Sequence, residues 1–252
     1  GQATRMMEYL IDGTREYRGM VELGIETDTY DALGSVVREI DASHVALKQV
    51  ENALLSFKGN IQQVPPMYSA LKRQGRRLYE LARAGIHVER NPRDVYVVSI
   101  EILNWVPPII DLRVTCGRGF YMRSLAHDLG QALGCGGYMK TLVRLRSGTF
   151  EISESLSLEK LEQMLATDSW QDSIFPPDHV VSNLKSVIVG RSLEEMIIQN
   201  RFLPPGLSLP IADPDEHCRV YSTDGRFIAI MYFNACKGLW QRTRRFSLNY
   251  CS

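Results

Sequence analysis

The sequence has no excess of charge of either sign, no long apolar run and few cysteines. Lysine and arginine number 29, as do aspartate and glutamate, so the formal net charge is zero. Any anionic partner must therefore be held by a local patch. No apolar run approaches about 18 residues, which excludes a membrane-spanning helix. The five cysteines form no C-x-x-C pair, so neither a disulfide framework nor a zinc site is expected, and the reducing cytoplasm is the expected location.

Several common catalytic motifs are also missing. The chain contains no G-x-x-x-x-G-K-[ST], no G-x-S-x-G and no H-E-x-x-H, which argues against a P-loop, a nucleophile elbow and a zinc protease. Gly117-Arg118-Gly119 begins like a dinucleotide-binding loop, but Met122 stands at the third glycine position. The 252 residues, 44% hydrophobic and 23% charged, instead indicate a folded protein of one or two domains.

The apolar periodicity predicts alternating strands and helices over the first 160 residues. Arg15 to Leu23 reads as a strand, and Val95 to Trp105 with Ile110 to Cys116 as a pair of strands. Residues 43–57 have helical spacing with Ser43 as a candidate cap, and Tyr121 to Leu133 is a second helical pattern.

The rest of the chain predicts a small separate module. Ser157 to Met164 reads as a capped helix, and residues 174–186 as a linker. Beyond the linker the patterns predict a helix at 192–200, a turn at 204–206 and strands near 218–222, 226–233 and 239–248.

One stretch is strongly basic within this neutral protein. From Lys72 to Arg93 there are seven lysines and arginines against Glu80 and Glu89, a net charge of +5. Such a run is either a solvated helix face or a nucleic-acid-binding surface. In the second case the cations would contact phosphates, and Tyr68 and Tyr79 would be available for stacking on bases.

A second cluster favours the nucleic-acid interpretation. Arg113, Arg118 and Arg123 surround a glycine turn beside Phe120 and Tyr121. Aromatic rings and guanidinium groups at a turn are suited to holding an unstacked base.

Ordered motifs then extend along nearly the whole chain, most densely over residues 1–160. They are Gly1-Gln2-Ala3-Thr4-Arg5, Arg15-Glu16-Tyr17-Arg18, Leu23-Gly24-x-x-Thr27-Asp28-Thr29-x-Asp31, Gln63-Val64-Pro65-Pro66-Met67-Tyr68-Ser69-Ala70-Leu71-Lys72, Gly75-x-x-Leu78-Tyr79-x-Leu81-Ala82-Arg83-x-Gly85, Cys116-Gly117-Arg118-Gly119-Phe120-Tyr121-Met122-Arg123-Ser124-Leu125 and Leu142-Val143-Arg144-Leu145. With them the chain resembles the TruB family of tRNA pseudouridine synthases, which isomerise the T-loop uridine at tRNA position 55.

The resemblance implies roles for individual residues. Tyr17 matches the tyrosine that packs on the flipped target base, and Arg123 the arginine that pairs with the catalytic aspartate. Tyr121 and Leu142 match residues lining the uridine pocket, and Asp31 an acidic residue of the cleft. The implied RNA-binding residues are Arg5, Lys72, Arg76, Arg77, Arg83, Arg118 and Arg144.

The resemblance also implies the architecture and the partners. The fold class would be α+β, with a mixed or antiparallel pseudouridine-synthase sheet over residues 1–180. Residues 58–93 would form a basic RNA-clamping insertion, and 186–252 a PUA-like RNA-binding domain. The partner would be the T arm of tRNA, bound by a monomer without a membrane, a metal or an organic cofactor.

One departure from the family pattern concerns the nucleophile. In the family the catalytic aspartate lies in a G-x-L-D-P segment, just upstream of the residues that correspond to Gly1 and its successors in this chain. The sequence contains no such segment, and its one Asp-Pro pair, Asp213-Pro214, lies in the C-terminal module. We therefore expect Arg123 to lack its carboxylate, the chain alone to bind T-arm RNA weakly without isomerising it, and the sheet to have an unpaired edge that lowers stability.

Two other functions remain open at this point. The chain could be a non-catalytic tRNA-binding or RNA-folding protein that kept the cleft, or a protein-interaction domain with a coincidental basic face. RNA binding should weaken steeply with salt, whereas the last alternative predicts no such dependence.

Overall fold

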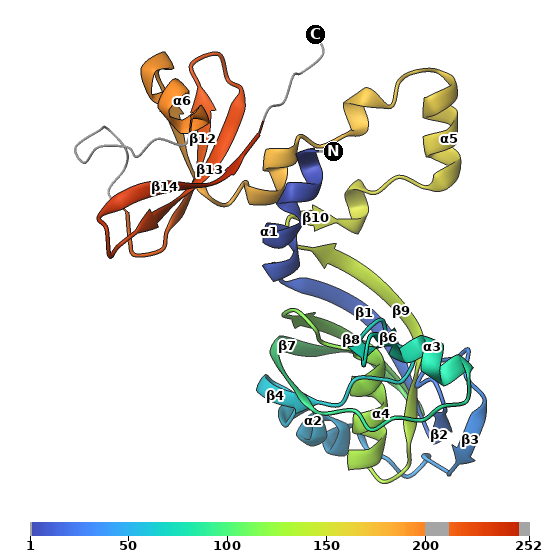
Figure 1. Ribbon diagram of the computed structural model, residues 1–252. Coiled ribbons are helices and arrows are strands. Elements are labelled where there is room, and N and C mark those ends of the chain that lie inside the picture. Colours follow the sequence, from blue (N-terminus) through green and yellow to red (C-terminus); the bar gives the residue numbers. More distant parts are fainter. Residues whose placement is uncertain (1, 200–211, 247–252) are drawn as a thin grey trace. The chain divides into compact units, whose positions relative to one another are not determined.

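The computed structural model describes residues 2–199 and 212–246, which belong to two compact units (Figure 1). One unit is Asp12–Ser155, and the other comprises Gly1–Ile11 and Leu156–Ser252. The turn predicted at 204–206 and the end of the strand predicted at 239–248 lie outside the described residues. Residues 156–180 thus belong to the same compact unit as the C-terminal module. The domain boundaries expected from the sequence, 1–180 and 186–252, stay a prediction.

The sheet of the Asp12–Ser155 unit has six antiparallel strands in the order β10-β9-β1-β8-β7-β4. These strands are β1 (Arg15–Leu23), β4 (Gly59–Gln63), β7 (Arg93–Val106), β8 (Ile109–Cys116), β9 (Gly137–Ser147) and β10 (Phe150–Glu151). The strand predicted at 15–23 and the pair predicted at 95–105 and 110–116 are confirmed. The α+β fold class is confirmed as well.

Two helices cover one face of this sheet. They are α2 (Leu47–Leu55) and α4 (Met122–Ala132), and they contact each other. Leu112 and Val114 of the sheet and Leu125 and Leu129 of α4 are fully buried in one core. Burying each such side chain stabilises the fold by about 1.5–3 kcal/mol.

The predicted start of the first of these helices was wrong. Ser43 does not cap a helix, because its backbone N–H and hydroxyl both donate to the Asp41 carboxylate. The helix begins at Leu47, where the Gln49 side chain accepts a hydrogen bond from the Ala46 N–H at 2.8 Å.

Helix α4 packs unusually close to the start of β9. A Cβ atom built on Gly130 would lie 2.1 Å from the carbonyl carbon of Gly136 and 2.1 Å from the nitrogen of Gly137. The Gly130 carbonyl also accepts hydrogen bonds from the N–H groups of Cys135 and Gly136. Only glycine fits where two backbones approach this closely.

Two hairpins and a short helix extend from the sheet. One hairpin consists of β2 (Ile25–Thr27) and β3 (Val36–Glu39). The basic stretch forms the other, β5 (Lys72–Arg73) with β6 (Arg76–Arg77), followed directly by α3 (Leu78–Arg83).

The second unit contains a four-stranded sheet in the order β11-β12-β13-β14, with β11 parallel to β12 and the other pairs antiparallel. Its elements are η1 (Gln2–Met6), α1 (Met7–Asp12), α5 (Leu158–Ala166), η3 (Gln171–Ser173), η4 (Pro177–Val181), β11 (Lys185–Val189), α6 (Arg191–Ile198), β12 (His217–Ser222), β13 (Phe227–Asn234) and β14 (Leu239–Arg245), and η2 (Ile152–Glu154) precedes α5. Ile197 of α6 and Val220 of β12 share one core, while Met6 and Phe227 belong to another. A small C-terminal β module is thus present.

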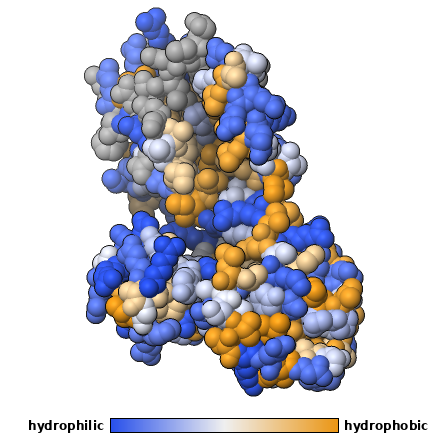
Figure 2. All heavy atoms as spheres, turned by 90° about the vertical axis from the view of Figure 1, so that its right-hand side faces the viewer, coloured by the Kyte–Doolittle hydropathy of each residue, from blue (hydrophilic) through white to orange (hydrophobic). Residues whose placement is uncertain are grey.

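Some apolar side chains are exposed within the described residues. Helix α5 has no buried residue, and its Leu158 and Leu165 are exposed, as are Leu33 and Val37 near the β2–β3 hairpin. Figure 2 shows hydrophobic areas interspersed with hydrophilic ones on one face of the molecule. No helix of the described residues is long and apolar enough to cross a membrane.

Helix α4 carries a carboxyl group whose titration can be tested. Burial raises the pKa of Asp128 to about 6, so the folded protein holds this proton more tightly than the unfolded chain. The contribution to stability is complete below about pH 4 and is lost as the pH rises through about 6. We expect Asp128→Asn to raise Tm at pH 8 and to leave it unchanged near pH 4. Thermal unfolding at both pH values checks this, and an equal shift at both would mean that packing, not titration, is responsible.

Candidate functional site

Tyr17 and Leu142 lie on neighbouring strands, on the helix-covered face of the sheet. Tyr17 of β1 is opposite Arg144 of β9, and Gly19 is opposite Leu142. Tyr17 is 8% exposed, whereas Leu142 is 45% exposed. The Arg144 guanidinium carbon lies 5.4 Å from the centroid of the Tyr17 ring, a cation–π contact. One phenol ring and one accessible aliphatic side chain therefore line this part of the face.

Arg123, in the first turn of α4, is already paired. Its Nη1 donates to Oδ2 of Asp31 at 3.0 Å, and its Nη2 donates to the Tyr68 carbonyl at 2.7 Å. The other Asp31 oxygen accepts from the Thr29 hydroxyl at 2.7 Å and from the Leu33 N–H at 3.1 Å. The expectation of an unpaired guanidinium was therefore wrong, because the 28–34 turn brings Asp31 onto the helix.

The pair still leaves binding capacity on the arginine. A guanidinium has five N–H donors, and the contacts with Asp31 and Tyr68 use two of them. The side chains of Arg123 and Asp31 are each 24% exposed, so a further anion can reach them. Asp31 thus holds the guanidinium in place while other donors remain available.

Close contacts connect this ion pair to the strand face. Asp31 forms a parallel β-bridge with Met139 of β9. A Cβ built at Gly19 would lie 2.8 Å from the Met139 sulfur and 3.4 Å from Cδ1 of Leu142. The Arg123–Asp31 pair and the Tyr17–Leu142 surface therefore border the same part of the sheet.

A reciprocal hydrogen-bonded contact positions Tyr121. The Gln63 side-chain amide donates to the Tyr121 carbonyl at 3.0 Å, and its oxygen accepts from the Tyr121 N–H at 2.8 Å. One turn later, the Ser124 hydroxyl donates to the Val64 carbonyl at 2.7 Å. Gln63 was not among the predicted site residues, although its position just before the Val64-Pro65-Pro66 breaker was a usable signal.

A ring stack holds the Asp31 turn at a second point. The rings of Tyr30 and His127 are nearly parallel, with centroids 3.9 Å apart. Burial lowers the pKa of His127, which favours the neutral imidazole. Helix α4 therefore fixes this turn through both Arg123 and His127.

The predicted RNA-binding residues fall into separate places. Lys72, Arg76, Arg77 and Arg83 all lie on the exposed basic hairpin and α3. The guanidinium carbons of Arg77 and Arg83 lie 5.8 and 5.6 Å from the ring centroid of Tyr79. Of the others, Arg118 is exposed on the turn before α4, Arg144 covers Tyr17, and Arg5 belongs to the other unit.

The described residues hold no cluster of three or more histidine, cysteine, aspartate or glutamate side chains that could bind a metal ion. Cys116 and Cys218 are buried, and burial raises their pKa values to about 11 and about 12. Both thiols therefore stay protonated near neutral pH and belong to the cores.

Comparison with known proteins identifies sequence relatives over most of the chain. Residues 1–122 match the family described as TruB family pseudouridylate synthase (N terminal domain), and residues 123–190 match the tRNA pseudouridylate synthase B C-terminal domain. A protein of Dehalococcoides mccartyi named tRNA pseudouridine synthase B is 42% identical over 92% of this chain and 76% of its own. The protein of the same name from Clostridium kluyveri is 39% identical, over 91% and 78%. The chain thus spans about three quarters of the length of these relatives.

Solved structures share the fold at lower identity. A chain in a structure entitled "Structure of H/ACA RNP bound to a substrate RNA containing 2'-deoxyuridine" has a TM-score of 0.69 and 19% identity, over 99% of this chain and 71% of that one. A chain of a Cbf5-Nop10-Gar1 complex has a TM-score of 0.65 and 22% identity, over 92% and 64%. At these identities the comparison supports the fold alone.

Proposed function

Because the chain belongs to the TruB family of pseudouridylate synthases, isomerases whose named relatives act on tRNA, we propose that it forms the uridine-binding cleft of a tRNA pseudouridine synthase specific for the T-loop uridine, position 55. The observation that carries the proposal is the Arg123–Asp31 pair beside the surface formed by Tyr17 and Leu142. An ordered guanidinium next to an aromatic ring and an aliphatic wall suits a flipped pyrimidine and a reacting carboxylate.

The reaction needs a base that has left its stack. In the isomerisation the N1–C1′ bond breaks, a C5–C1′ bond forms, C5 loses a proton and N1 gains one. Stacking and apolar contacts offset the cost of unstacking, which is a few kcal/mol. We assign base contacts to Tyr17, Tyr121 and Leu142, and we assign Asp31 the positioning of Arg123 rather than a proton transfer.

The Tyr17 ring imposes one condition on this assignment. Arg144 already lies over the ring, and the residue is largely buried. A uracil that stacks on Tyr17 must therefore use the ring face or edge that Arg144 leaves accessible, or displace the guanidinium. We assign Arg144 a contact with the RNA backbone beside the flipped base.

The nucleophile is the component that these 252 residues do not contain. They include no G-x-L-D-P segment, and the described structure gives Arg123 only Asp31 as a carboxylate partner. We propose that the remaining guanidinium donors receive the carboxylate of such a segment. The chain alone then binds T-arm RNA without isomerising it.

The sheet offers a place where an additional strand could pair. β7 pairs with β8 along Val97–Val106 but with β4 only along Arg93–Val97. Within the described residues, 98–106 thus have a hydrogen-bonded partner on one side only, and Val98 and Val106 are exposed. An open edge of this length favours pairing with another strand.

The proposal is tested by supplying the segment. We expect no pseudouridine when the chain alone is incubated with a T-arm hairpin, and formation when the chain is fused at its N-terminus to a segment that carries the family's G-x-L-D-P motif. The matched control is the same fusion with the aspartate of that motif replaced by asparagine. Pseudouridine formed by the chain alone, or no activity of a folded fusion that binds the hairpin, would contradict the proposal.

The second candidate function is non-catalytic tRNA binding. Two observations favour it: the Arg123 guanidinium is engaged by Asp31, and the Tyr17 ring is engaged by Arg144. It predicts salt-sensitive binding of the hairpin by both the chain and the fusion, with no pseudouridine from either.

A further inference from the structure

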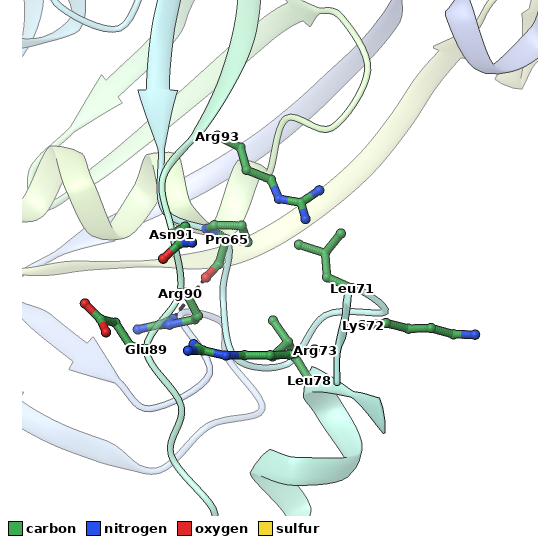
Figure 3. Close-up of a pocket in the computed structure, with 9 residues that line it drawn as sticks. All are labelled: Pro65, Leu71, Lys72, Arg73, Leu78, Glu89, Arg90, Asn91 and Arg93. Atoms are coloured by element: carbon green, nitrogen blue, oxygen red, sulfur yellow. Dashed lines mark hydrogen bonds between the residues drawn. The ribbon is translucent and has the colours of Figure 1, made fainter. Parts of the chain in front are cut away.

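Two cavities of the Asp12–Ser155 unit have linings of opposite charge. The cavity beneath the basic hairpin (Figure 3) is lined by four cations and one acid, which are Lys72, Arg73, Arg90, Arg93 and Glu89. The other cavity is lined by the carboxylates of Glu22, Glu39 and Asp41, and among the described residues its lining includes no lysine, arginine or histidine. A polyanion such as RNA is therefore attracted to the first cavity and repelled by the second.

The acidic cavity lies at the C-terminal end of β1, where that strand meets the β2–β3 hairpin and the turn between β7 and β8. Its volume is about 520 Å³, within the roughly 300–1,000 Å³ of pockets that hold small ligands. Glu22 follows Tyr17 by five positions on β1, a separation of about 16 Å along a strand. The cavity is thus separate from the surface formed by Tyr17 and Leu142.

Glu22 supplies a fixed carboxylate to this lining. Its side chain is 17% exposed, and its Oε2 accepts hydrogen bonds from the Tyr138 hydroxyl at 2.6 Å and from the Lys140 ammonium at 2.9 Å. Burial opposes its ionisation, but these two hydrogen bonds outweigh burial and lower the pKa of Glu22. Both donors use the same oxygen, which leaves Oε1 for a further donor.

The other two carboxylates are exposed on the 39–43 segment. Hydrogen bonds from the Ser43 N–H at 2.9 Å and from the Ser43 hydroxyl at 2.8 Å lower the pKa of Asp41. The described residues contain no group of three acids, cysteines or histidines that could hold a metal ion. A single ligand that neutralises these carboxylates must therefore be extended, with its positive charges spaced along it.

Apolar groups contribute much of the remaining lining, and the backbone there is already engaged. Ile25, Ile40 and Pro108 are half-buried in the lining, and such a surface suits the methylene groups of a cationic chain. The Leu23 N–H donates to the Pro108 carbonyl at 3.0 Å, and the Ile40 N–H donates to the Gly24 carbonyl at 2.8 Å. A peptide main chain therefore finds few free donors here, whereas an alkylammonium ion needs only carboxylate acceptors.

We infer that this cavity binds an aliphatic polyamine, whose ammonium groups contact Glu22 and Glu39 and whose methylene groups lie on Ile40 and Pro108. Each ammonium donates N–H groups to carboxylate oxygens, and such charge-assisted hydrogen bonds are stronger than neutral ones. The ligand also relieves the mutual repulsion of three like charges. The inference goes beyond the proposed function and does not depend on it.

Calorimetric titration of the 252-residue chain with spermidine at low salt tests this site. We expect saturable binding at one site per chain. Glu39→Gln should raise Kd about threefold, the effect of losing one exposed ion pair, and Glu22→Gln combined with Glu39→Gln should raise it at least about tenfold. The matched control Glu162→Gln removes an exposed acid of α5 and should leave Kd unchanged. The Tm of each variant shows whether it is folded.

Other cations separate a built site from general attraction to negative charge. 1-Aminobutane, which has a single ammonium group, should bind at least about tenfold more weakly than spermidine. Mg²⁺ at the same concentration of charge should displace little spermidine, because the carboxylates do not converge on one ion. A trilysine peptide should bind more weakly than spermidine, because its main chain finds few partners in the lining.

The outcomes divide clearly. Saturable binding that the Glu22 and Glu39 variants weaken and Glu162→Gln does not weaken supports the site. No saturable binding by the folded chain, an equal loss in Glu162→Gln, or full displacement by Mg²⁺ overturns it. Tighter binding of trilysine than of spermidine would assign the cavity to a basic protein segment, and the polyamine assignment would be wrong. No readout involves RNA, so the proposed function is tested separately.

Discussion

Arg123→Met should lower pseudouridine formation by the active fusion at least about a hundredfold, the effect seen when one preorganised donor to a developing charge is removed. Arg123 joins Asp31 at 3.0 Å and the Tyr68 carbonyl at 2.7 Å, and methionine replaces both contacts with an apolar chain of similar length. Without the guanidinium, a carboxylate entering the cleft is neither oriented nor kept ionised. The measurement is the rate with a T-arm hairpin under single-turnover conditions.

Two comparison variants separate the effect of the positive charge from that of the planar guanidinium and its Asp31 contact. Arg123→Lys keeps the charge but cannot bridge two acceptors with a planar fork, so its activity should fall between those of the parent and Arg123→Met. Asp31→Asn keeps the turn contacts from Thr29 and Leu33, and its loss should be smaller than that of Arg123→Met. Hairpin affinity and Tm are recorded for each. Equal activity of Arg123→Met and the parent, with both folded, would remove Arg123 from the mechanism.

Gly130→Ala should destabilise the Asp12–Ser155 unit by about 3 kcal/mol, the upper part of the range for overpacking. The added methyl carbon would lie 2.1 Å from backbone atoms of Gly136 and Gly137, and a backbone cannot rotate away as a side chain does. At about 2–4 °C per kcal/mol for a domain of this size, Tm should fall by at least about 6 °C. Thermal unfolding followed by circular dichroism measures the change.

Gly117→Ala is the matched control for this prediction. A Cβ at Gly117 would lie 3.5 Å from the Tyr96 carbonyl oxygen, an ordinary van der Waals distance, so its Tm should change little. A Gly130→Ala protein as stable as the Gly117→Ala protein would mean that α4 can move away from β9 at small cost.

The regular elements near the site were predictable because their apolar patterns repeat. β8 has the apolar residues Ile110, Leu112 and Val114 at alternate positions, all fully buried, with the polar Asp111 and Arg113 between them, and this period of two identifies a strand from sequence alone. The start of α2 was not predictable in this way. Ser43 is a favourable capping residue type, but Asp41 competes for its donors, and Gln49 sets the start instead.

The contacts within the site depended on tertiary structure. Arg123 and Asp31 are separated by 92 positions, and the sequence contains many other acids that could have paired with the arginine. The Arg144–Tyr17 contact depends on the β1–β9 register, which shifts between Glu16 and Tyr17 and between Met20 and Val21. Irregularities of this kind leave no periodic trace in the sequence. The family resemblance identified these residues, but their hydrogen-bond and ion-pair partners could be found only from the structure.

The reciprocal bond between Gln63 and Tyr121 has a mechanical consequence. The chain that leaves Gln63 is bonded to α4 through Val64 and Tyr68 before it reaches the basic hairpin. These bonds therefore attach the segment that precedes the hairpin to the helix turn that carries Arg123. Under the proposed function, RNA bound at the hairpin would be connected through these few bonds to the residue that orients the reacting carboxylate.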